Sequence, residues 1–143
     1  MSHAITLARR GAANDEIPVG AVIANANGKV IAAAHNLTKA GHNALFHAEL
    51  LVIMDACKRL GAMRLSEFDL FVTLEPCAMC AAAISHARLK RVYFANYDPK
   101  GGAVDHGAKW FDQKTCLHRP EIIGGFMELE AKDLLPDFFK SLR

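Results

Sequence analysis

Four residues with reactive side chains occur in two short motifs, and they are the first candidates for chemistry. His47 is followed two positions later by Glu49, and Cys77 is followed three positions later by Cys80. Side chains three apart on a helix lie on the same face, so both thiols could bind one ion. Imidazole and thiolate are ligands that Zn²⁺ prefers in proteins. The pattern therefore predicts a zinc site formed by His47, Cys77 and Cys80.

This ligand set is typical of a catalytic zinc site. Structural sites usually use four protein ligands, whereas catalytic sites use three and keep one position open for water. Zinc lowers the pKa of such a water from about 16 to roughly 7, so hydroxide becomes available. Because Glu49 points in another helical direction than His47, we expect its carboxylate to move protons in the substrate space. The other interpretations of the cysteine pair are a structural zinc site and a redox pair.

Both motifs, with the sequence around them, resemble the cytidine deaminase superfamily, whose zinc enzymes carry His-x-Glu followed by Pro-Cys-x-x-Cys. Within it, the bacterial tRNA-specific adenosine deaminases are the nearest likeness. The similarity runs from about Ala4 to the C-terminus and includes the runs 16–22, 72–77 and 98–103. It implies a three-layer αβα fold around a five-stranded mixed sheet, a homodimer and bound Zn²⁺. It also implies conversion of the wobble adenosine of a tRNA anticodon to inosine.

The resemblance assigns roles to three further residues. Asn36 matches the family asparagine that hydrogen-bonds the target base. Ala48 matches the small residue whose backbone lies against that base, and Asp98 matches the loop acid that touches the backbone of the anticodon loop. These roles follow from the resemblance, because Asn36 and Asp98 alone would be typical turn residues.

The chain departs from the family pattern directly before His47. The family usually has Asp-Pro-Thr-Ala or similar there, whereas this chain has Asn43-Ala44-Leu45-Phe46. Phe46 could reshape the pocket or repack the helix start, and Asn43 could cap that helix as aspartate would. An alternative function is therefore deamination of a free nucleobase or nucleoside such as guanine or cytosine. A non-catalytic RNA-binding module would have lost a ligand or Glu49, and this chain keeps them.

The elements that must position these residues alternate between helix and strand patterns. Helical spacing of apolar residues predicts helices over 4–11, 47–60, 77–87 and 128–142, the last interrupted at Pro136. Strand patterns cover 18–24, 29–34, 69–74, 91–95 and 121–124, with a turn at Asn27-Gly28. The alternation predicts a layered α/β fold in which the metal ligands lie at two helix starts.

Length and composition agree with one zinc-dependent deaminase domain over residues 1–143. The chain is 52% hydrophobic and 22% charged, which is typical of a soluble globular domain. No apolar run is long enough to span a bilayer, and the first ten residues lack the apolar segment of a secretory signal. A net charge of +2 neither requires nor excludes RNA. We therefore expect a cytoplasmic enzyme without a membrane partner, and the resemblance adds a tRNA anticodon loop as its substrate.

Overall fold

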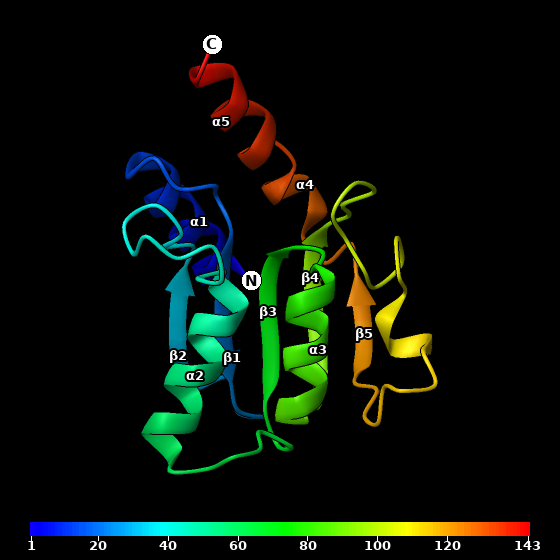
Figure 1. Cartoon of the computed structure of the whole chain (residues 1–143). Helices are drawn as coiled ribbons and strands as arrows, with labels where there is room; N and C mark the ends of the chain where they lie inside the picture. The colour runs from blue at the N-terminus through cyan, green and yellow to red at the C-terminus, as the bar shows by residue number, and fades with distance from the viewer.

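A five-stranded sheet forms the centre of the computed structural model, which describes all residues, 1–143 (Figure 1). Its strands lie in the order β2-β1-β3-β4-β5. They are β1 (Gly20–Ala24), β2 (Val30–His35), β3 (Asp69–Leu74), β4 (Arg91–Asn96) and β5 (Glu121–Gly124). β1 is antiparallel to both of its neighbours, whereas β3, β4 and β5 are parallel. The predicted five-stranded mixed sheet is thus confirmed.

Helices cover both faces of the sheet and complete three layers (Figure 1). They are α1 (Ser2–Ala13), α2 (Ala48–Leu60), α3 (Ala78–Ala87), α4 (Glu128–Ala131) and α5 (Leu134–Ser141), with a 3-10 turn η1 (Trp110–Asp112). Successive side chains of a strand point to opposite faces. In β1, Ala21 and Ile23 join the main core beneath α2 and α3, whereas Val22 packs against α1. The predicted αβα layering is confirmed.

The starts of α2 and α3 lie at the edge of the sheet where β3 and β4 end (Figure 1). His47 immediately precedes α2 and Cys77 immediately precedes α3, in extended backbone conformation. α2 ends at Leu60 and is capped by Gly61, whose φ of 60° is the left-handed conformation that glycine adopts most easily. Both helices therefore begin at the predicted ligands, and both point their N-terminal ends toward the same edge.

The prediction for the C-terminal helix was wrong in one respect. The interruption lies at Lys132 and Asp133, between α4 and α5, and Pro136 belongs to the first turn of α5. First-turn N–H groups have no partner within a helix, so a proline there removes no helical hydrogen bond. Pro136 is therefore compatible with the start of α5. None of the helices combines the length and apolar character that crossing a membrane requires.

Candidate metal centre and active site

The starts of α2 and α3 bring His47, Cys77 and Cys80 together. The Sγ atoms of Cys77 and Cys80 lie 3.7 Å and 3.6 Å from His47 Nδ1. All three ligand atoms lie within 4.8 Å of one another. A tetrahedral zinc ion, with bonds of about 2.3 Å to sulfur and 2.0–2.1 Å to nitrogen, would separate nitrogen from sulfur by about 3.6 Å. The three side chains therefore fit one zinc ion.

The electrostatics of this cluster favour a cation. A hydrogen bond from Cys80, joined by one from His47, lowers the pKa of the Cys77 thiol to about 4. The hydrogen bond between His47 and Cys77 also raises the pKa of the His47 imidazole. Cys77 also lies at the N-terminal end of α3, where the helix dipole stabilises negative charge. Thiolate and neutral imidazole are the forms that bind a metal ion, so a bound metal would displace the protons of these groups.

Glu49 lies next to the ligands in the first turn of α2. Only 4% of this residue is exposed, and burial raises the pKa of its carboxyl group to about 7. Burial is the main cause of this raised pKa; the negative charge of Cys77 contributes to it, while the backbone N–H of Glu49 and the charge of His47 oppose it. A carboxyl group with a pKa near neutrality can both accept and donate a proton at physiological pH. Glu49 thus has the properties of a general acid and base.

Asn36 fixes the start of α2. Its Oδ1 accepts a hydrogen bond from the Ala48 N–H at 2.8 Å, and both residues are buried. This bond satisfies one of the N–H groups that lack a partner in the first turn of a helix. Asn43 does not cap α2, because its Oδ1 accepts a hydrogen bond from the Leu45 N–H instead. The cap comes from the end of β2, a tertiary contact that the sequence before α2 does not reveal.

His47, Cys77 and Glu49 line a hollow of about 470 Å³, whereas Cys80 is buried and does not reach its wall. Its walls include residues from three other parts of the chain, among them Asn36, Thr38, Asp98, Lys100, Leu135 and Phe139. The structure thus brings the predicted Asn36 and Asp98 to the same hollow as Glu49. Ala48 is fully buried at the start of α2. One polar end and one apolar wall suit a flat heterocyclic base with a reactive edge.

Asp98 also has a structural role in its loop. Its Oδ1 accepts hydrogen bonds from the N–H groups of Lys100 and Gly101, at 3.1 Å and 3.0 Å. This is the turn geometry that aspartate commonly stabilises. One carboxylate oxygen of Asp98 therefore fixes the shape of the wall.

Phe46 packs against the loop before α2. A Cβ atom added to Gly41 would lie 2.4 Å from Cδ2 of the Phe46 ring, so the ring fills the space that a side chain at Gly41 would need. Phe46 is absent from the lining of the hollow. Of the two expectations for Phe46, repacking is therefore the one that the structure supports.

Sequence reasoning missed Leu135 and Phe139, which line the hollow from α5. The neighbouring Phe138 is buried with 6% exposed, whereas Phe139 is 48% exposed. Adjacent helical residues point about 100° apart, so one ring can pack while the next faces a cavity. The adjacent Phe138 and Phe139 were the sequence feature that could have indicated that α5 lines the hollow.

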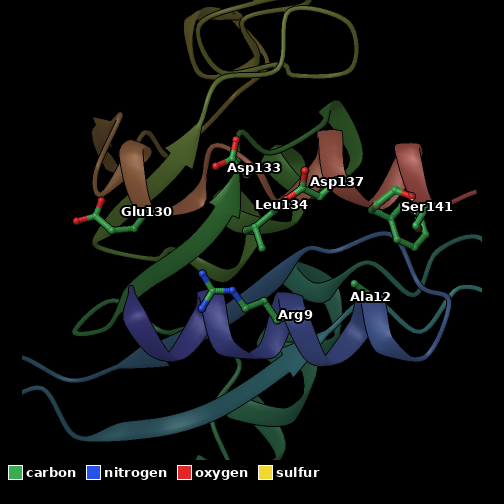
Figure 2. A pocket seen from close by; sticks show the side chains of 8 residues that line it. Arg9, Ala12, Glu130, Asp133, Leu134, Asp137 and Ser141 are labelled. Atoms are coloured by element: carbon green, nitrogen blue, oxygen red, sulfur yellow. Dashed lines mark hydrogen bonds between the residues drawn. The ribbon is translucent and has the colours of Figure 1, made fainter.

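A second hollow, of about 460 Å³, lies between α1 and the C-terminal helices. Figure 2 shows Arg9 on α1 below the segment that carries Asp133 and Asp137. Phe138 lines this hollow, whereas Phe139 lines the first one. The second hollow has no thiol or imidazole in its lining. The one group of three potential metal ligands whose donor atoms lie close together is His47, Cys77 and Cys80, at the starts of α2 and α3.

Known proteins are similar to this chain in sequence and in fold. The family described as cytidine and deoxycytidylate deaminase zinc-binding region matches residues 1–96. The tRNA-specific adenosine deaminase of Agrobacterium fabrum is 47% identical over 143 residues, covering 100% of this chain and 93% of that protein.

Two solved structures are similar to this chain in fold and sequence. A tRNA:A34 deaminase, studied for A-to-I editing at the wobble position of transfer RNA, has a TM-score of 0.92 and 47% identity, covering 94% of this chain and 97% of that one. A guanine deaminase from Bacillus subtilis has a TM-score of 0.64 and 40% identity, covering 67% of this chain and 61% of that one.

Proposed function

The chain belongs to the cytidine and deoxycytidylate deaminase family and, within it, to the tRNA-specific adenosine deaminases, and we propose that it converts a tRNA wobble adenosine to inosine. One observation carries the chemistry: the three zinc-type ligands lie together, and two of them, His47 and Cys77, line a base-sized hollow with the buried Glu49. The full-length similarity to adenosine deaminases of tRNA supports the substrate.

We propose that His47, Cys77 and Cys80 hold Zn²⁺, which when bound makes a water molecule acidic enough to attack at neutral pH. Glu49 accepts a proton from that water and passes one to the ring nitrogen of adenine. The oxygen of the water bonds to the carbon that carries the amino group. Glu49 then takes the second proton from this oxygen and gives it to the amino group, which leaves as ammonia while the oxygen becomes the carbonyl of inosine. One buried carboxyl group thus acts as base and then as acid.

Three residues are proposed to contact the substrate. Asn36 hydrogen-bonds the target base, the backbone of Ala48 lies against it, and Asp98 contacts the backbone of the anticodon loop. The positions of Asn36 and Asp98 in the wall of the hollow support these roles. Lys100, in the same wall, adds a positive charge that favours a phosphate group.

We also propose that residues 1–143 act as one domain, because the hollow takes residues from Ile17 to Phe139. We further propose a cytoplasmic location, which the tRNA substrate supports. The resemblance to the family implies a homodimer, and we propose that state for this chain.

The alternative, deamination of a free nucleobase or nucleoside such as guanine or cytosine, is not favoured, because the similarity to the guanine deaminase covers only 67% of this chain. The zinc-loaded protein should be incubated with an anticodon stem-loop that has adenosine at the wobble position, and separately with guanine, cytosine and adenosine. Our proposal predicts inosine in the stem-loop, and none with the Glu49→Ala variant. Ammonia from guanine or cytosine without inosine in RNA would contradict it.

A further inference from the structure

Two loops without regular secondary structure contribute residues to the wall of the hollow. The first, residues 36–47 between β2 and α2, contributes Asn36 and Thr38. The second, residues 97–109 between β4 and η1, contributes Asp98 and Lys100. Neither loop has a strand or helix ladder to fix it, so other contacts must hold these residues in place.

Glu75 holds the second loop. Its Oε1 accepts hydrogen bonds from the N–H groups of Val104, Asp105 and His106, at 3.1, 2.9 and 3.0 Å. Its Oε2 is 2.9 Å from the Asp98 N–H and 2.8 Å from His106 Nδ1. The side chain is fully buried. One carboxylate thus binds both ends of the segment 98–106.

Gly102 shows how closely this loop fits around Glu75. A Cβ atom added to Gly102 would lie 2.5 Å from Glu75 Cδ and 2.5 Å from the Asp98 carbonyl oxygen. Such distances are not compatible with a side chain. By contrast, a Cβ atom added to Gly101 would meet only the Asp98 carboxyl group, at 2.9 Å, and that group can move. The loop is therefore built around the Glu75 carboxylate.

Glu16 holds the first loop in the same way. It is fully buried before β1, and its Oε1 accepts hydrogen bonds from the N–H groups of Lys39 and Ala40, at 3.0 Å and 2.8 Å. Its Oε2 accepts one from the Thr38 hydroxyl at 3.1 Å. All of these donors belong to residues 38–40. The carboxylate therefore acts on one loop only.

We infer that Glu16 and Glu75 are positioning residues, each of which fixes one substrate-binding wall of the hollow. Neither needs to touch the reacting atoms, because each acts through its loop: Glu16 through Thr38, and Glu75 through Asp98. Because the walls are fixed before substrate arrives, the binding energy of the substrate is not spent on ordering them. The loss of either carboxylate should weaken substrate binding more than it slows the chemical step.

Glutamine has the shape of glutamate but replaces one acceptor oxygen with a donor. Glu75→Gln therefore tests the contacts of the second loop, and Glu16→Gln tests those of the first. Hydrogen exchange should be measured on the zinc-loaded full-length proteins. Glu75→Gln should speed exchange of the 98–106 amides at least about tenfold and leave 38–40 unchanged, and Glu16→Gln should do the reverse. Faster exchange in both loops and the core, unchanged exchange, or lost zinc would overturn the inference.

If Glu75→Gln does not fold, Gly102→Ala disturbs the same contact from the loop side. It should speed exchange over 98–106 as well, whereas Gly101→Ala, the matched control, should not. Equal effects of the two alanine variants would show that the fit around Glu75 does not hold the loop.

The kinetic readout rests on the proposed function. With an anticodon stem-loop, each glutamine variant should raise KM about tenfold and keep kcat within about threefold. A lower kcat at unchanged KM would contradict positioning of substrate walls. If the wild type makes no inosine, the proposed function fails, while the exchange experiment still decides the inference because it needs no turnover.

Discussion

Replacement of Glu49 by glutamine tests the proton-transfer step with little change of shape. Glu49 is 4% exposed, and burial raises its pKa to about 7. At neutral pH the carboxyl group can therefore take and give a proton, whereas a carboxamide can do neither. General acid and base groups contribute about 10²- to 10⁴-fold, or roughly 3–5.5 kcal/mol of activation free energy. We expect Glu49→Gln to slow deamination by a factor in this range.

The assay is the single-turnover rate of inosine formation in a wobble-adenosine stem-loop, with excess enzyme and equal zinc content in both proteins. Glutamine at position 49 leaves His47, Cys77 and Cys80 in place, so zinc binding should be unchanged. A variant rate within about tenfold of the wild type would refute the role of Glu49 as the proton carrier. Loss of zinc would show instead that Glu49 supports the metal site.

Four further outcomes follow from the described contacts. Asn36→Ala removes the acceptor for the first N–H of α2, and it should lower the free energy of unfolding in urea by about 1–3 kcal/mol, while Asn36→Asp retains most of it. Burial alone would raise the pKa of Glu16, but hydrogen bonds from residues 38–40 outweigh it and lower the pKa below 4.5. Its contribution to stability is therefore present above pH 4.5 and lost as pH falls through the lowered value, so acid titration of thermal stability should be flatter in Glu16→Gln. Cys80→Ala should abolish stoichiometric zinc, measured by elemental analysis, and activity with it. Phe46→Ala should lower the free energy of unfolding by about 1–3 kcal/mol yet leave KM unchanged, and an altered KM would place Phe46 in the pocket.

Features that depend on local sequence were predicted well. β3 and β5 have the predicted bounds, because short runs of branched and aromatic residues end at turn signals. The three zinc-type ligands were predicted because two of them share one helical turn and His47 begins another helix. Pro136 was misplaced, because a proline is compatible with the first turn of a helix as well as with a break.

Features that depend on tertiary contacts were not predicted. Phe139 reaches the hollow only because α5 packs beside it, and no periodicity in the sequence reveals that placement. The partners of Glu16 and Glu75 lie 22 to 31 residues further along the chain. The only local signal is an acid that stands near a proline at the edge of an apolar run. Such a signal marks a burial site but not the loop that is bound there.

The most direct test of the account is the dependence of inosine formation on zinc. Protein stripped with a chelator and protein reloaded with one Zn²⁺ per chain should be compared on a stem-loop whose wobble position is adenosine. We predict no inosine without zinc, and full recovery on reloading, with one ammonia released per inosine. Inosine formation by the stripped protein, or none by the reloaded protein, would contradict the assignment of this chain as a zinc-dependent deaminase of tRNA adenosine.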